Sequence, residues 1–260
     1  MIKLIYELLS IFLIMVFIGC GTKRDIHAKS EEGYHLYLLV GQSNMAGRGV
    51  IGEIDTTIHP RVFALNINDE FIPAKEPLHF DKSNRGVGPG FEFGKVMASA
   101  NSKAKIGLIP AAVGGTKISY WEPHSPKGLY EEAIRKTRIA MEYGKLKGII
   151  WQQGESDSNI KDAPLYKERL IKLLTTFRND LGDDTLPIVI GGLGDFLKSE
   201  RFKDINKALQ EAANQIGNAS FSEASKQGHI GDRLHFNSSA QRENGRNMAA
   251  AMSKLISNID

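Results

Sequence analysis

Short apolar runs alternate along the chain with longer stretches in which apolar residues recur at helical spacing. Four runs are short enough for strands that are buried on both faces: residues 36–40, 106–109, 148–151 and 188–190. Helical spacing covers residues 91–100, 129–143, 165–181, 202–216 and 239–256. This alternation is typical of a mainly parallel sheet with helices on both faces, so we predict an α/β fold with three layers, an α/β/α sandwich.

The folded part is predicted to be one domain, residues 34–260. The chain has 260 residues, of which 42% are hydrophobic and 24% charged, as expected for one ordinary globular domain. Residues 21–33 are polar and charged, with too little apolar content to pack, and we expect a flexible tether there.

Residues 1–20 have the pattern of a signal peptide. Lys3 precedes an apolar run at residues 8–18, which is too short to span a bilayer comfortably. Gly19 and Cys20 follow, and this ending resembles the lipobox of bacterial lipoproteins, in which Cys20 becomes the site of lipid attachment. Cys20 is the only cysteine, so no intrachain disulfide can form. We therefore expect an extracytoplasmic bacterial lipoprotein, held on the membrane in the periplasm or at the cell surface. A plain signal anchor is the alternative.

Charge and motif content exclude several function classes. Lys and Arg total 33 against 30 Asp and Glu, and the net charge of +3 does not favour a nucleic-acid partner. The seven histidines form no His-Glu-x-x-His motif, and the glycines form neither a P-loop nor a dinucleotide fingerprint. We expect neither a metal nor a cofactor.

Candidate chemistry follows the apolar runs, because ligands of a parallel sheet bind beyond the carboxyl ends of its strands. Ser43, in GQSNMAG, is a nucleophile candidate or a helix N-cap. Gly114 and Gly115 could turn backbone N–H groups toward an oxyanion or form only a tight turn. The Gln153 side chain could donate to the same oxygen or be a hydrogen-bonded core amide.

Asp232 and His235 stand three residues apart near the C-terminus. The carboxylate can hold the imidazole tautomer while the other ring nitrogen faces a serine, although a purely structural hydrogen bond is also compatible with this spacing. Together with the three segments above, the pair supplies a nucleophile, a base, an orienting group and oxyanion donors at one sheet edge. Four separate structural explanations are jointly improbable.

The motifs GQSNMAGRG, AAVGGT, WQQGESD and DRLHF occur in an order that resembles the SGNH (GDSL-like) hydrolases. Within them, the chain is similar to carbohydrate esterase family six and the sialate O-acetylesterase domain, over nearly all of residues 34–256. The resemblance implies a flavodoxin-like SGNH fold and a serine esterase that needs no cofactor. Its expected substrate is an acetylated oligo- or polysaccharide, such as acetylxylan. A sialic acid-specific O-acetylesterase and an inactive carbohydrate-binding domain on the same fold are the alternatives.

The resemblance also implies residue roles. Ser43 is expected to be the nucleophile, His235 the general base and then acid, and Asp232 the group that orients it. The implied oxyanion donors are the amide of Ser43, an amide of Gly114 or Gly115, and the side chain of Gln153.

Residues beside these motifs are candidate substrate contacts: Gln42, Asn44, Glu155 and Trp121. Tyr120 and Trp121 could stack on a sugar ring or belong to the core. Glu155 and Asp157 could orient nearby groups, or lie at the surface or cap a helix. Arg48 could reach an acidic sugar or remain solvated.

Overall fold

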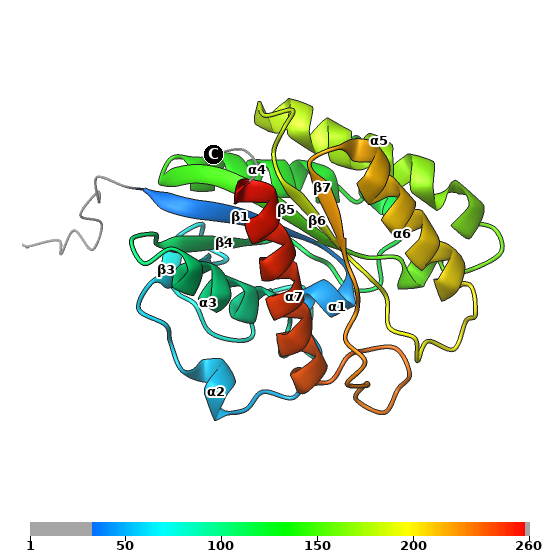
Figure 1. Cartoon of the computed structure of the whole chain (residues 1–260), viewed down its shortest axis with the longest axis horizontal. Helices are drawn as coiled ribbons and strands as arrows, with labels where there is room; N and C mark the ends of the chain where they lie inside the picture. Colours follow the sequence, from blue (N-terminus) through cyan, green and yellow to red (C-terminus); the bar gives the residue numbers. More distant parts are fainter. Residues whose placement is uncertain (1–32, 258–260) are drawn as a thin grey trace, which may run out of the picture. The chain divides into compact units, whose positions relative to one another are not determined.

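A seven-stranded sheet lies at the centre of residues 33–257, the part of the chain that the computed structural model describes (Figure 1). Its strands are β1 (Tyr34–Gly41), β2 (Val62–Leu65), β3 (Phe71–Pro73), β4 (Ile106–Pro110), β5 (Gly144–Gln152), β6 (Ile188–Gly191) and β7 (Ala219–Ser222). The strand order is β3-β2-β4-β1-β5-β6-β7, and every neighbouring pair is parallel except β2 and β3. The predicted signal peptide, Cys20 and nearly all of the predicted tether lie outside the described residues.

Helices cover both faces of this sheet. The longer ones are α3 (Gly90–Ala100), α4 (Leu129–Met141), α5 (Ala163–Leu181), α6 (Phe202–Ile216) and α7 (Ser238–Ser257). The helices α3 and α7 pack together on one face, and α4, α5 and α6 lie on the other (Figure 1). This arrangement confirms the predicted three-layer α/β/α fold with a mainly parallel sheet.

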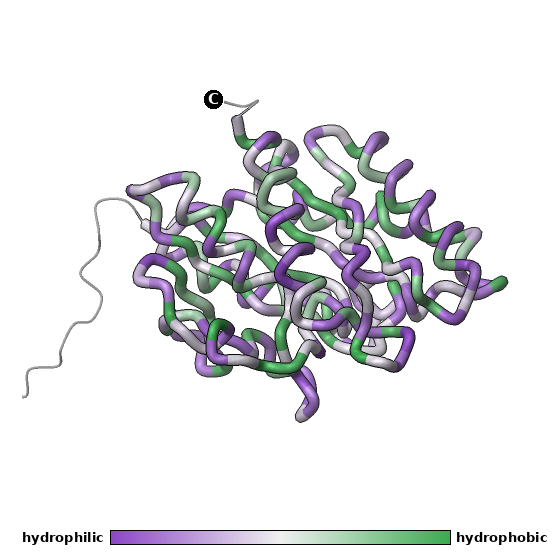
Figure 2. Tube along the Cα trace, turned by 60° about the horizontal axis from the view of Figure 1, so that its bottom comes forward, coloured by the Kyte–Doolittle hydropathy of each residue, from purple (hydrophilic) through white to green (hydrophobic). Residues whose placement is uncertain are grey.

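The alternation of side chains along β1 shows how one strand serves both layers. Leu36, Leu38 and Val40 pack in the core cluster under α4, α5 and α6, whereas Tyr37 and Leu39 pack in the cluster under α3 and α7. All five are buried, because successive side chains of a strand point to opposite faces. Figure 2 shows hydrophobic positions gathered in the interior, with hydrophobic and hydrophilic positions alternating along the outer helices.

Three strands were not predicted from the sequence. The strands β2, β3 and β7 have three or four residues each and lie toward the edges of the sheet. Edge strands are buried on fewer sides, so their sequences do not need the continuous apolar run of a central strand. The strand β5 is longer than predicted and begins at Gly144, directly after the helix that was expected to extend to Tyr143.

Short helices follow the strand ends: α1 (Ser43–Ala46) after β1, the 3₁₀ turn η1 (Ile118–Tyr120) after β4, and the 3₁₀ turn η2 (Glu155–Asp157) after β5. A further short helix, α2 (Glu53–Thr56), precedes β2. Within residues 33–257, no helix combines the length and the apolar character needed to cross a bilayer.

Candidate active site

Ser43 begins α1, two residues after the end of β1. Gly41 has φ 136°, and a Cβ there would stand 2.0 Å from the carbonyl oxygen of Gln152 in β5. Only glycine therefore allows this turn. Gln42 is the N-cap residue of α1, so Ser43 is not in the capping position, and its hydroxyl is available for another contact.

The Ser43 hydroxyl contacts the predicted base. Its Oγ lies 2.9 Å from Nε2 of His235, and Nδ1 of the same ring lies 2.5 Å from Oδ2 of Asp232. The structure thus brings these three residues into one hydrogen-bonded chain. Such a chain can pass a proton from a hydroxyl to an imidazole whose other nitrogen is held by a carboxylate.

The Asp232 carboxylate is fixed by its own turn. Its Oδ1 accepts hydrogen bonds of 2.9 Å from the backbone N–H groups of Leu234 and His235. Arg233, between them, has φ 55°, a left-handed conformation that is uncommon for a residue with a side chain. Burial raises the pKa of Asp232, but the hydrogen bonds donated by His235 and Leu234 have a larger effect in the opposite direction. The pKa of this carboxyl group therefore lies below its usual value. The carboxylate therefore stays ionised beside the imidazole.

A pocket of about 330 Å³ opens over this chain of contacts. It lies beyond the carboxyl ends of β1, β4 and β5, where a parallel sheet gathers its ligand-binding segments. Its lining residues are Gln42, Ser43, Arg48, Lys82, Asn84, Gly114, Gly115, Glu155, Ser156, Leu234 and His235.

The two glycines differ in what their amides do. The Gly114 N–H donates to Oδ2 of Asp81 at 2.9 Å, so a protein carboxylate already occupies this expected oxyanion donor. The N–H groups of Gly115 and Ser43 donate to no group of the described residues. These two amides are therefore free to donate to a bound group.

The Gln153 side chain lies below the pocket, not in its wall, which corrects the expected oxyanion role. It is fully buried, and its Nε2 donates to Oε1 of Gln42 at 3.0 Å, the carbonyl of Thr116 at 3.0 Å and Oδ2 of Asp157 at 2.6 Å. Tyr166 closes the network, with its hydroxyl 2.9 Å from Oε1 of Gln153. Both hydrogens of this amide are donated to groups in the protein interior. Gln153 is therefore a hydrogen-bonded core amide, the alternative given above.

Gln42, by contrast, lines the pocket, although it is only 2% exposed. Its Oε1 accepts from Nε2 of Gln153 and, at 3.4 Å, from the N–H of Ser156. With the oxygen held inward, the Nε2 group has no partner among the described residues and is not sealed from solvent. An amide fixed in this way is a preorganised donor next to Ser43.

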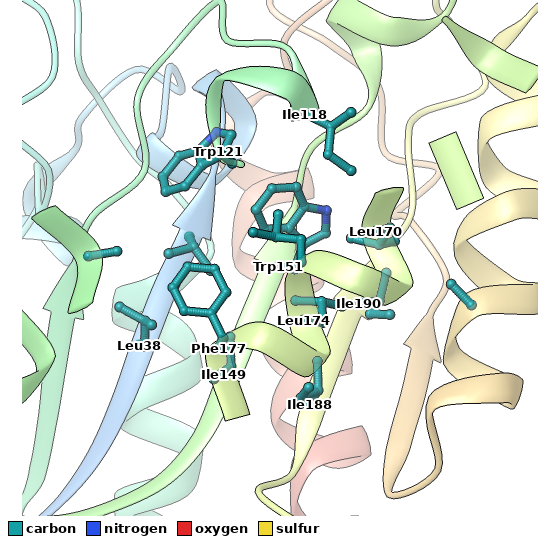
Figure 3. Close-up of a cluster of buried hydrophobic side chains, with 14 of the residues drawn as sticks. Leu38, Ile118, Trp121, Ile149, Trp151, Leu170, Leu174, Phe177, Ile188 and Ile190 are labelled. Carbon is teal, nitrogen blue, oxygen red and sulfur yellow. The ribbon is translucent and has the colours of Figure 1, made fainter. Parts of the chain in front are cut away.

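Trp121 belongs to the core, which corrects its expected role as a substrate contact. Its side chain is 0% exposed, and Nε1 donates to Oγ1 of Thr116 at 3.1 Å. The ring packs edge-on against Trp151, with centroids 5.6 Å apart (Figure 3). A sugar ring cannot reach it without displacing this packing.

Of the other expected contacts, Glu155 lines the pocket and Asn44 does not. Asn44 is 1% exposed, and its side chain bonds to Glu155, to the Leu234 carbonyl and to the Phe236 N–H. Burial raises the pKa of Glu155 to about 7, and burial also raises the pKa of Asp157, which is fully enclosed. Asp157 therefore supports the Gln153 network and has no surface role.

A buried ion pair was missed by reasoning from the sequence. Arg48 is not solvated: its Nη2 lies 2.6 Å from Oδ2 of Asp81, and Nη1 donates to the carbonyl of Gly47 at 2.6 Å. A Cβ on Gly114 would meet this Nη2 at 2.3 Å, so glycine leaves the space that the guanidinium fills. Asp81 and its neighbours Lys82 and Asn84 lie in an irregular segment without periodicity, and only tertiary structure brings them to the site.

Within the described residues, no group of three or more His, Cys, Asp or Glu side chains is arranged to hold a metal ion.

Comparisons with known proteins identify the family. Residues 33–254 match the family described as carbohydrate esterase, sialic acid-specific acetylesterase. The chain is similar to a protein of Arabidopsis thaliana named as a probable carbohydrate esterase, with 35% identity over 175 residues, 59% of this chain and 66% of that protein. The chain thus spans just under two thirds of this relative. The X-ray structure of the A. thaliana protein has a TM-score of 0.76 and 30% identity, and the match covers 85% of this chain and 98% of that one.

Two further structures share the fold. A carbohydrate acetylesterase from Xanthomonas citri has a TM-score of 0.70 at 18% identity, over 86% of this chain and 56% of that chain. NanS has a TM-score of 0.68 at 17% identity, over 87% of this chain and 98% of that chain. Because the family match spans most of the sequence and includes every residue of the site described above, the chain belongs to the family of carbohydrate esterases described as sialic acid-specific acetylesterases, within the SGNH-like hydrolases.

Proposed function

We propose that the protein is a serine esterase that removes O-acetyl groups from carbohydrate through an acyl-enzyme intermediate. The observation that carries this proposal is the contact chain from Ser43 Oγ through the His235 ring to Asp232, which borders an open pocket. Family membership supports an ester of a sugar as the substrate. An inactive binding domain would have no need to keep all three groups in contact.

In the first half-reaction, Nε2 of His235 takes the proton of Ser43 as Oγ attacks the acetyl carbonyl. Asp232, ionised, accepts the hydrogen on Nδ1 and so keeps Nε2 free to receive a proton. The protonated His235 then gives that proton to the departing sugar oxygen. The products of this step are the free sugar hydroxyl and acetyl-Ser43.

The oxyanion formed in each half-reaction needs donors that are already in place. The free N–H groups of Ser43 and Gly115 and the Nε2 group of Gln42 supply them. This set replaces Gly114 and Gln153, whose donors are used by Asp81 and by the buried network. Fixed dipoles of this kind stabilise developing charge without having to reorient during the reaction.

In the second half-reaction, His235 removes a proton from water as the water oxygen attacks the acetyl carbonyl. The resulting tetrahedral centre collapses with cleavage of its bond to Ser43 Oγ, the proton on Nε2 returns to that oxygen, and acetic acid leaves with the other hydrogen of the water and ionises in solution. Each proton removed is thereby returned, and the triad is restored.

A sugar that carries a carboxylate, such as sialic acid, is favoured over a neutral one by a single feature of the pocket. Lys82 lines the pocket and makes no ion pair among the described residues. Arg48 is already neutralised by Asp81, so Lys82 is the cation that an anionic sugar can meet. Replacement of Lys82 by Met should lower kcat/KM for acetylated sialic acid more than for acetylated xylan, whereas Lys172→Met on α5 should change neither.

Acetate release by the purified protein and its Ser43→Ala variant tests the reaction itself. We expect turnover of an acetylated sugar or aryl acetate to fall by several orders of magnitude in the variant, because a triad acts as a unit. A fluorophosphonate should label Ser43 of the native protein, and peptide mass spectrometry locates the label. Activity retained in Ser43→Ala would rule out the serine mechanism.

The proposal for localisation rests on the sequence of residues 1–20. We infer a lipid attachment at Cys20 that holds the esterase outside the cytoplasm. Mass spectrometry of the mature N-terminus from membranes of cells that express the full chain tests it. An unmodified Cys20, or an uncut Met1, would exclude it.

A further inference from the structure

Asn44 occupies a central place in the site without reaching the pocket. It follows Ser43 in α1, is 1% exposed and is absent from the pocket wall. Substrate contact, its expected role, is therefore excluded by burial. The hydrogen-bond partners of its side chain indicate a different role.

The side-chain amide of Asn44 contacts the backbone on both sides of the base. Its Oδ1 accepts from the N–H of Phe236 at 3.1 Å, and its Nδ2 donates to the carbonyl of Leu234 at 3.1 Å. These peptide groups flank His235. The uncharged amide offers an acceptor and a donor side by side to match them, which an ionised carboxylate cannot do. We call this pair of bonds the Asn44 clamp.

Two further bonds fix the clamp itself. The second hydrogen of Nδ2 is donated to Oε1 of Glu155, and the carbonyl of Asn44 accepts from Nε2 of Gln241 in α7 at 2.9 Å. Both amide hydrogens and the side-chain oxygen are thus engaged. Glu155 holds the side-chain amide of Asn44, and Gln241 holds its backbone carbonyl from the α7 side.

The turn that carries His235 does not set the distance to Ser43 by itself. Its internal bonds, from Leu234 and His235 to Asp232 and from Ile230 to the His235 carbonyl, hold the imidazole relative to the carboxylate but do not reach Ser43. Asp232 and Arg233 are exposed, and Leu234 is 38% exposed. The Asn44 clamp is what joins this surface turn to the residue next to the nucleophile.

We propose that Asn44 is a positioning residue that sets the Ser43 to His235 geometry by gripping the two peptide groups that flank the base. The proposal rests on the serine mechanism proposed above. Phe236 anchors the same turn separately: it is fully buried and packs edge-on against Phe196 at 5.0 Å. Loss of the clamp should therefore misalign the base without releasing the turn or unfolding the domain.

The experiment compares Asn44→Ala and Asn44→Asp with the native protein, using kcat and KM for an aryl acetate and thermal unfolding. Misplacement of a catalytic group by about 1 Å costs on the order of a hundredfold in rate. We expect kcat of Asn44→Ala to fall by about tenfold to a hundredfold, with KM changed by less than about threefold. Asn214→Asp on the exposed face of α6 is the control and should match the native protein.

Asn44→Asp adds a measurement, the pH dependence of kcat/KM, that would not change if Asn44 had only a structural role. An ionised aspartate side chain at this position cannot donate to the Leu234 carbonyl, and it faces Glu155, whereas a protonated one regains the donor. We expect the ratio of kcat/KM between this variant and the native protein to rise as the pH is lowered from about 8 to about 5.5. The ratio cancels the pH dependence of the triad common to both proteins.

Three outcomes would overturn the proposal. These are native kcat in Asn44→Ala, a raised KM at unchanged kcat, and a pH-independent ratio in Asn44→Asp at native melting temperature. The Ser43→Ala variant, measured beside them, separates the two hypotheses. If it is inactive while Asn44→Ala is normal, only the positioning role fails; if it is active, the serine mechanism fails.

Discussion

The hydroxyl oxygen of Ser43 lies 2.9 Å from Nε2 of His235, although 192 positions separate the two residues in the chain. Ser43 follows the central strand β1, and His235 precedes α7, the last helix. Their contact exists because α7 packs on the same face of the sheet as α3 and returns the end of the domain to the carboxyl edge of β1. The proposed catalytic geometry is therefore a property of the whole domain.

Asp232→Asn should lower kcat/KM by about a hundredfold to ten-thousandfold. An asparagine can donate to Nδ1 of His235, which favours the tautomer with its hydrogen on Nε2, and that nitrogen can no longer accept the proton of Ser43. Steady-state hydrolysis of an aryl acetate measures the loss. Asp195→Asn, at an exposed position after β6, is the control. A rate within about threefold of the native protein would show that the carboxylate does not set the tautomer.

The sequence was sufficient to predict the strands and helices that have a clear hydrophobic period and the site residues that lie within recognisable motifs. The central strands and long helices followed from periodicity, and Ser43, Asp232 and His235 are in contact as expected. The edge strands were missed because three or four residues carry no clear period. Gln153 and Trp121 were misplaced because a motif shows which residues are near a site, but not which way each side chain points.

Gln42 and Gln153 should respond differently to replacement by Ala. Gln42→Ala removes a donor beside Ser43 and should lower kcat by about a hundredfold to a thousandfold, with a smaller loss of stability than Gln153→Ala because the long bond from the Ser156 N–H is the one left without another acceptor. Gln153→Ala leaves the Thr116 carbonyl without a donor in the core and leaves Oδ2 of Asp157 with only the Ile118 N–H, at a cost of about 1 to 3 kcal/mol in the free energy of unfolding. Kinetics and denaturant unfolding of both variants test this. A stable, slow Gln153→Ala beside a normal Gln42→Ala would return Gln153 to the oxyanion hole.

Arg48→Ala should destabilise the protein by about 3 to 5 kcal/mol, because it strands the buried carboxylate of Asp81. The double variant with both Arg48→Ala and Asp81→Asn should recover part of this lost stability, since a neutral amide needs no counterion. Urea unfolding at neutral pH measures both variants. Arg201→Ala removes an exposed pair with Asp204 and should cost less than about 1 kcal/mol. Equal losses at the two arginines would show that the Arg48 pair is not desolvated.

Glu155→Gln should flatten the dependence of stability on pH. Burial raises the pKa of Glu155 from 4.5 to about 7, so between these values the folded protein keeps a proton that the unfolded chain has released. The free energy of unfolding of the native protein therefore falls as the pH rises from 4.5 to 7, by at most about 1.4 kcal/mol per pH unit for this proton.

Glutamine at position 155 keeps the oxygen that accepts from Asn44 and replaces Oε2, which has no partner among the described residues. Urea unfolding at several pH values should give a shallower slope for this variant, while Glu168→Gln, an exposed side chain on α5, should keep the native slope. An unchanged slope in Glu155→Gln would show that Glu155 is ionised throughout this range in the folded protein.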